Sequence, residues 1–501
     1  MSEGTVERAE GWLAPILRHL LAAVLGGLLA IALYKLWGLE GRWFYAVIIG
    51  VVGLSAAMAL VAVFSDFVMI CFFLAIPLAG FGKWFFPGNL RDTVWSSNHH
   101  NATMEGILGL GLVDFAIVAF YMSWFYRIFV LREEDLPKVN LIDFFVALLF
   151  AAYVISIPGT AKPNLGLHAT AYLFKFVLLY FYLSRNLQAR HLPWFIGSVI
   201  FAIFLEGALG AVQHTTGRLV GLALDKGSGT ALDYQYQVPG TSGWYRATGT
   251  LYDSHTLGLY MAMLGPFMLA MTFWRGGRPL LNLIFGSALV LSLAILVMTL
   301  TRSGWVASAV SMTLAIFLML FVWREGRLVP FLVVFLFVIL LSAPWSVDMV
   351  IERIQRAPEG TVNVRLQGYE VATYIWSQYP IFGFGAGNFM EAHYLHSYGW
   401  NQDIVVHNTI LLLGTEVGIL GVIGFYGAIF VAAWRLWKIG KTSTSLVRRL
   451  AFGAVIALAA TVVEGMATPV HREPTAYTMF WLLIAMGVAL PRIERERAAD
   501  A

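Results

Sequence analysis

Long, continuous apolar runs recur along the chain, and they restrict its fold more than any other feature of the sequence. About 20 mostly apolar residues are enough to cross the hydrocarbon core of a bilayer. Since lipid cannot hydrogen-bond to the backbone, each spanning segment is an α-helix or part of a closed barrel. These runs do not alternate with polar residues, so they predict helices. Charged residues make up only 12% of the chain, about half the level of soluble proteins. The sequence therefore predicts an all-α, polytopic transmembrane protein.

The runs predict about 12–14 membrane spans. They centre near residues 20–35, 45–63, 66–82, 105–126, 142–157, 168–184, 193–212, 255–273, 280–299, 304–322, 329–343, 408–433, 450–466 and 475–490. Under this count, the short connections rich in Arg and Lys, such as "SRNLQAR" and "RLWKIGKTSTSLVRR", all fall on one side. Short basic loops mark the cytoplasmic side, so both termini are predicted to be cytoplasmic. The two long hydrophilic segments then face the opposite side.

This pattern divides the chain into six parts. They are N-terminal spans at 1–212, an outer loop at 213–254, spans at 255–343, a second outer loop at 344–407, C-terminal spans at 408–490 and a cytoplasmic tail at 491–501. The second loop contains "VNVRLQGYEVATYIWSQYP", whose aromatic residues favour a helix lying along the outer membrane interface.

Charge and cysteine content exclude several classes of function. The net charge of +4 is typical of cytoplasmic arginines in a membrane protein and gives no reason to expect nucleic-acid binding. Cys71 is the only cysteine, which excludes an intrachain disulfide and a cysteine-rich metal site. No cleavage pattern precedes the first span, which is expected to remain as a signal anchor.

Arg302, in "MTLTRSGWVAS", is the most informative polar residue on the outer side. A charged side chain near the hydrocarbon costs free energy, so it is retained for an ion pair, an anionic ligand or contact with the headgroups. A guanidinium fits phosphate oxygens. Arg246 in "WYRATGTLYDSH", Arg365 in "NVRLQGYE" and His407 in "VVHNTILLLG" lie on the same side. Taken singly, such arginines are usually solvated, and such a histidine is usually an interface residue.

Several further residues have two readings. Asn408 is a good N-cap for the following span. Gly383 and Gly385, in "PIFGFGAGNF", permit either a phosphate-binding turn or close packing of helices. Glu464 lies inside a predicted span, and an ionisable residue there is a functional hypothesis by default; His471 could line the same cavity.

The order of these motifs resembles the superfamily of O-antigen ligases and O-antigen polymerases. The resemblance covers residues 240–430 and rests on "RATGTLYDSHTLGLY", "TLTRSGW", "VRLQGYEVATYIWSQYPIFGFGAGNF" and "HNTILLLGTEVGILG". One departure is the longer segment "LDKGSGTALDYQYQVPGTSG" before Arg246, which puts the transfer of acceptor specificity in doubt.

The resemblance implies a GT-C-like fold in the bacterial inner membrane with its active site on the periplasmic side. It implies that Arg302, Arg365 and, less securely, Arg246 bind the diphosphate of an undecaprenyl-diphosphate-linked glycan donor. It implies that His407 is the catalytic base, and Asn408, Gly383, Gly385, Glu464 and His471 are candidate supporting residues. The expected reaction inverts the anomeric centre and requires neither a metal nor a soluble cofactor.

The resemblance leaves the acceptor open. A polymerase extends another lipid-linked glycan, whereas a ligase transfers the glycan to lipid A-core; the enlarged outer loop favours a polymerase of surface polysaccharide or exopolysaccharide. Membrane lipids are expected partners, and proteins of polysaccharide export or chain-length control are candidate partners. A transporter of lipid-linked glycan or solute is the alternative from another class, but it would place polar residues near the midplane of two related halves.

Overall fold

The computed structural model describes most of the chain after residue 56. The described residues are 53, 57–78, 82–84, 109–131, 138–216, 245–251, 253–272, 279–324, 326, 328–329, 332, 351, 360–396, 405–443 and 446–499. The chain divides into two compact units, residues 1–72 with 114–138 and residues 73–113 with 139–501. All of the candidate site residues belong to the second unit.

The described elements are helical apart from one short antiparallel strand pair, β1 (Gly82–Trp84) with β2 (Gly109–Gly111). The helices of the first half are α3 (Ser65–Ala75), η1 (Ile76–Leu78), α6 (Leu112–Phe125), η2 (Tyr126–Val130), α7 (Leu141–Ser156), α8 (Pro163–Asn186), η3 (Ala189–His191) and α9 (Leu192–Thr216). Those of the second half are α11 (Ser254–Thr272), α12 (Pro279–Met298), α13 (Arg302–Phe317), η4 (Leu318–Val322), α15 (Gly360–Gln378), α16 (Phe389–His396), α17 (Thr409–Thr442), α18 (Leu446–Glu464), η5 (Val470–Arg472) and α19 (Pro474–Ala499).

The predicted all-α membrane architecture is confirmed. Within the described residues, eight helices are long and apolar enough to cross a membrane, or nine if the bent pair Ala57–Val63 and Ser65–Leu78 is one span. The shorter apolar helix α7 and the buried helix α11 coincide with two further predicted spans. The span predicted at 20–35 lies outside the described residues, as does the span predicted at 329–343 except for residues 329 and 332.

The first unit holds most of α3 and α6, together with η2 and the helix Ala57–Val63. Phe72 and Phe120 meet edge to face, with ring centroids 5.4 Å apart. Phe67 and Phe115 are largely exposed, as expected for apolar side chains that face lipid.

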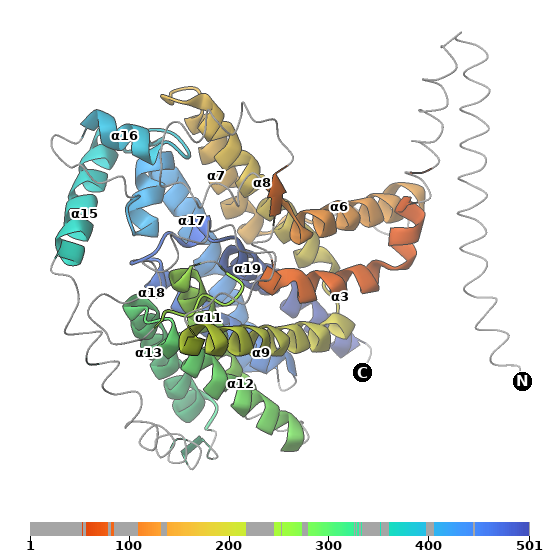
Figure 1. Ribbon diagram of the computed structural model, residues 1–501. Coiled ribbons are helices and arrows are strands. Elements are labelled where there is room, and N and C mark those ends of the chain that lie inside the picture. Colours follow the sequence, from red (N-terminus) through yellow and green to blue (C-terminus); the bar gives the residue numbers. More distant parts are fainter. Residues whose placement is uncertain are drawn as a thin grey trace, which may run out of the picture. The chain divides into compact units, whose positions relative to one another are not determined.

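Helix α11 lies at the centre of the second unit. Every residue of α11 except His255 is buried, and the helix packs against α12, α13 and α18 (Figure 1). Its sequence is apolar all round, which is typical of a helix covered on all sides. Helix α17 packs against α7, where Gly424 allows close approach: a Cβ there would lie 2.6 Å from the backbone nitrogen of Leu149.

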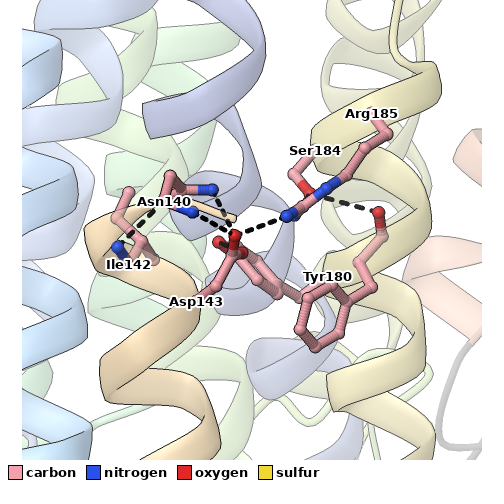
Figure 2. A network of polar contacts seen from close by, with 7 residues as sticks. Asn140, Ile142, Asp143, Tyr180, Ser184 and Arg185 are labelled. Atoms are coloured by element: carbon pink, nitrogen blue, oxygen red, sulfur yellow. Dashed lines mark hydrogen bonds and ion pairs between the residues drawn. The ribbon is translucent and has the colours of Figure 1, made fainter. Parts of the chain in front are cut away.

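Buried charge joins α7 to α8 at one end of the second unit (Figure 2). The carboxylate of Asp143 accepts hydrogen bonds from the Asn140 amide, from the Tyr180 hydroxyl at 2.6 Å and from the Arg185 guanidinium. A buried carboxylate is tolerated when it is both paired and hydrogen-bonded. Nearby, Arg492 of α19 donates to the Leu187 carbonyl at 2.5 Å. The start of α7 therefore lies with the ends of α8 and α19, and we call this the basic end.

The opposite end, which we call the site end, gathers the other ends of these helices. Lys162, before α8, pairs with Glu391 of α16 at 2.6 Å. Ser156, the last residue of α7, accepts from the Ala386 amide at 3.1 Å. Helices α15 and α16 lie beside α17 at this end (Figure 1). The predicted helix in the second outer loop is thus present as α15.

Candidate active site

His407 and Asn408 directly precede α17 at the site end. The Asn408 side-chain oxygen accepts from the Leu411 amide at 3.0 Å, which caps the helix. Its Nδ2 group donates to the Met466 carbonyl at 3.2 Å. Asn408 is therefore an N-cap that also fixes the start of α17 to the loop between α18 and α19.

The loop between α18 and α19 connects the helices that form the site. Thr409 donates its amide to the Gly465 carbonyl at 2.7 Å and its hydroxyl to the Thr468 carbonyl at 3.0 Å. The Tyr369 hydroxyl of α15 lies 3.0 Å from the Met466 carbonyl and 3.3 Å from the carbonyl of His407. The base candidate is thus held by its own backbone between α15, α17 and the loop.

Arg365 and His407 come together from elements far apart in the sequence. Burial lowers the pKa of His407, the charge of Arg365 lowers it further, and a hydrogen bond to the Val405 backbone and the charge of Asp253 act in the opposite direction. A neutral imidazole has one donor and one acceptor nitrogen. The bond to Val405 therefore leaves the other nitrogen as the acceptor, which is what a base needs.

Arg246 reaches the same end from the segment before α11. Its Nε donates to the Thr299 carbonyl at 3.1 Å, and its NH2 lies 3.3 Å from the Thr301 hydroxyl. Thr301 directly precedes Arg302, the first residue of α13, which is half-buried. Arg246 therefore contacts the turn between α12 and α13, directly before Arg302.

Acid–base groups on α11 complete the cluster. The charges of Arg246, Arg365 and His407 all act on His255, as does that of the exposed residue Asp253. The Thr301 hydroxyl, which contacts Arg246, donates to the Ser254 carbonyl at 3.0 Å, so Arg246 lies beside the first turn of α11. Sequence analysis included Asp253 and His255 in the Arg246 motif but assigned them no role.

Glu473 lies against the same turn of α11. Its carboxylate accepts from the Thr256 hydroxyl. Burial raises the pKa of Glu473 to about 7, and the Asp253 carboxylate acts in the same direction.

Glu464 closes the cluster at the end of α18. One carboxylate oxygen accepts from the Ser303 hydroxyl at 2.8 Å and from the Thr468 hydroxyl at 3.2 Å. The other oxygen is buried and has no hydrogen-bond partner among the described residues, while the charge of Arg365 acts on the group. Glu464 therefore links α13, next to Arg302, with the loop between α18 and α19.

The glycine-rich turn after α15 packs its backbone closely against α17. Its backbone inserts at a kink in α17, where Gly418 has a φ of 70°. The Phe384 amide donates to Thr415 at 2.7 Å, and the Gly385 amide donates to Glu416 at 2.9 Å. Gly383 has a φ of 71°, and a Cβ there would lie 2.4 Å from the backbone of Glu416. The close approach requires glycine.

The amides of this turn are already occupied by protein acceptors. Those of Gly387 and Phe389 donate to the Glu416 carboxylate, which also pairs with Arg472. The anion that this turn binds is therefore the Glu416 carboxylate. This contact favours the packing explanation of the glycines over a phosphate-binding turn.

His471 faces a different space from the charged cluster. It lines a cavity with the Glu416–Arg472 pair and the aromatic rings of Tyr153, Tyr172 and Tyr477. Burial lowers the pKa of His471 to about 3, and Arg472 lowers it as well. Its ring nitrogens have no partner within the described part of the chain. The structure does not bring His471 together with His407.

Two contributors to the site were overlooked in the sequence. Tyr369 follows Arg365 by four residues on α15, a spacing that puts both on one helix face. Ser303 directly follows Arg302. Both signals were available, whereas the role of Glu473 depends on a contact across 217 residues that no local pattern indicates.

Residues 287–426 match a family model described as O-antigen ligase. The matched segment runs from α12 into α17 and includes Arg302, Arg365 and His407. No curated protein has a matching sequence.

Proposed function

We propose that this chain, whose residues 287–426 match a family model described as O-antigen ligase, is a member of the O-antigen ligase and polymerase superfamily. We propose further that it is an inverting glycosyltransferase that uses an undecaprenyl-diphosphate-linked glycan as donor. The proposal places the chain in the bacterial inner membrane with the site end in the periplasm and both termini in the cytoplasm. Its support is that the short basic connections, with Arg185, Arg449 and Arg492, lie at the end of the helices away from His407, since such connections mark the cytoplasmic side.

One observation carries the proposal: Thr301, directly before Arg302, contacts the Arg246 guanidinium and donates to the Ser254 carbonyl at the start of α11. The charges of Arg365 and His407 act on His255 in the same turn. Two or three guanidinium groups suit a diphosphate, whose charge increases as it leaves the sugar. Preorganised donors aimed at developing charge are usually the largest contribution to such catalysis.

In the proposed reaction, His407 removes a proton from the acceptor hydroxyl. The hydroxyl oxygen forms a bond to the anomeric carbon as the bond from that carbon to the diphosphate oxygen breaks. The electron pair leaves with undecaprenyl diphosphate, the proton remains on the imidazole, and attack from the opposite face inverts the anomeric centre. The lowered pKa of His407 keeps the imidazole neutral at periplasmic pH.

We propose a polymerase as the first reading, in which the acceptor is another lipid-linked glycan. The support is the long segment between α9 and α11, which offers extra chain next to Arg246. A ligase acting on lipid A-core is the second reading, and the description of the matching family supports it. A transporter is less well supported, because the candidate site residues Arg246, Arg302, Arg365 and His407 lie at one end of the helices, whereas a transporter places its binding residues near mid-span.

The test supplies the purified protein with undecaprenyl-diphosphate repeat units, with or without lipid A-core, and resolves the products on a gel. A ladder without core identifies a polymerase, and product that requires core identifies a ligase. Absence of transfer under both conditions would overturn the proposal.

The variant His407→Ala tests the base. Its rate should fall by about 10²–10⁴-fold, while its thermal unfolding midpoint stays near that of the wild type. A matched control is His168→Ala, a half-buried histidine of α8, which should keep its activity. If His407→Ala kept the turnover rate of the wild type, His407 would be an interface residue and not the base.

A further inference from the structure

Three residues of α9 form a stripe on one face of that helix. Glu206, Gly210 and Gln213 are spaced four and three residues apart, which aligns them along the helix. Glu206 and Gln213 are buried, although α9 is a candidate membrane span. Polar side chains in such a position require partners.

The segment Ala247–Thr250 provides those partners. The Gln213 side-chain oxygen accepts from the amides of Thr248 at 3.0 Å and Gly249 at 2.7 Å, and its Nε2 donates to the Gly249 carbonyl at 2.9 Å. Seven residues earlier, the Glu206 carboxylate accepts from the Thr250 amide at 2.8 Å and the Thr250 hydroxyl at 2.5 Å.

Glycines allow the segment to lie directly on α9. A Cβ on Gly210 would come within 3.4 Å of the Ala247 Cβ. Gly249 has a φ of 58°, and a Cβ there would lie 1.8 Å from a carboxylate oxygen of Glu206. The side chains of Glu206 and Gln213, with Gly210 and Gly249, thus hold the segment Ala247–Thr250 against α9 in one backbone conformation.

The opposite side of the segment is fixed as well. There the Ala247 amide donates to the Met298 carbonyl of α12 at 3.0 Å. On the α9 side, His214 Nδ1 lies 2.5 Å from the Tyr245 carbonyl. Arg246 therefore extends from a backbone held on both sides, with its guanidinium against Thr299 and Thr301.

We infer that Glu206 and Gln213 are positioning residues, which act on the lipid-diphosphate donor through Arg246. This inference rests on the proposed function. A guanidinium that is already oriented loses less conformational freedom when it binds a diphosphate, and small misplacements of a binding group cost up to about a hundredfold in rate.

The test compares Gln213→Ala, Arg246→Ala and the double variant in the full-length protein, with undecaprenyl-diphosphate repeat units as donor. Gln213→Ala should lower kcat/KM for the donor by about tenfold or more, and the double variant should match Arg246→Ala alone. Hydrogen exchange in the peptide covering 245–251 should accelerate in Gln213→Ala. Ser198→Ala, which removes a buried hydroxyl bonded within α9, is the matched control and should change none of these quantities.

Independent, multiplying effects of Gln213→Ala and Arg246→Ala would overturn the inference, as would faster exchange with unchanged donor kinetics. If Gln213→Ala fails to fold, the near-isosteric Glu206→Gln takes its place in the same cycle with the same expectations. Absence of transfer by the wild-type protein would instead refute the proposed function, so the two failures are distinguishable.

Discussion

At the scale of single residues, the charge of Arg365 acts on three acid–base groups, His255, His407 and Glu464. Each group comes from a different helix or helix entrance. A charge shared in this way gives Arg365 two effects, attraction of a diphosphate and control of the proton affinity of the base.

The second effect predicts a change in pH dependence. His407 acts as a base only when neutral, so activity falls as the pH drops through its pKa. Arg365 lowers that pKa; therefore Arg365→Gln should raise it and shift the acid limb of the activity profile to higher pH. Transfer rates between pH 5 and 8, normalised to each variant's maximum, measure the shift.

Arg365→Lys is the control for that prediction, because it retains the positive charge while losing the guanidinium fork. Its maximal rate should drop, but its acid limb should stay near that of the wild type. An unshifted limb in Arg365→Gln would show that the charge of Arg365 does not reach His407.

At the scale of elements, the contact between the glycine-rich turn and α17 is specified by backbone conformation. Gly383 and Gly418 both have positive φ. A Cβ added at either position would clash with the backbone of the other segment. The Ile419 amide donates to the Pro380 carbonyl at 2.9 Å, which replaces a hydrogen bond that the kink removes from the helix.

Gly383→Ala should consequently destabilise the protein. The left-handed conformation alone costs about 1–2 kcal/mol for a residue with a Cβ, and the contact with Glu416 adds to it. The midpoint of thermal unfolding of the purified protein measures the effect. Gly197→Ala serves as the comparison, because Gly197 of α9 has no neighbour within 4 Å of an added Cβ; that variant should be neutral or slightly more stable.

The local elements could be predicted, but the kink could not. "HNTILLL" indicates an N-cap and a helix because both signals lie within a few residues, and α17 begins as expected. The continuation "GTEVGILG" looks like uninterrupted helix, since the cause of the kink is a turn some thirty residues earlier in the chain. The glycines of that turn indicate close approach but do not identify the partner.

At the scale of the whole molecule, the two ends of the second unit differ in chemistry. The basic end holds the arginines and lysines of the short connections, whereas the site end holds the polar cluster and α15. The hydropathy count predicted this alternation, because each span reverses the chain direction. It could not predict that Arg246 would contact Thr299 and Thr301, directly before Arg302, since this contact depends on how α9, α11 and α12 pack.

Cysteine labelling tests the proposed orientation. In a Cys71→Ser background, Tyr374→Cys on exposed α15 should react with a membrane-impermeant maleimide in intact cells. Lys441→Cys at the other end of α17 should react only after permeabilisation. The reverse result would place the site in the cytoplasm and exclude a periplasmic donor.

The length of α17 also has a consequence for the depth of the chemistry. The apolar portion after Gly418 ends at Trp434, before Arg435, Lys438 and Lys441. It is about 24 Å long at the rise of an α-helix, less than the roughly 30 Å of acyl chains. The turns before the kink are therefore needed to complete the crossing, and in the proposed orientation His407, which precedes them, lies at the outer edge of the acyl chains. In the proposed function, the polyprenyl carrier can then keep its tail among the acyl chains while its sugar is transferred. The diphosphate therefore does not have to enter the hydrocarbon core.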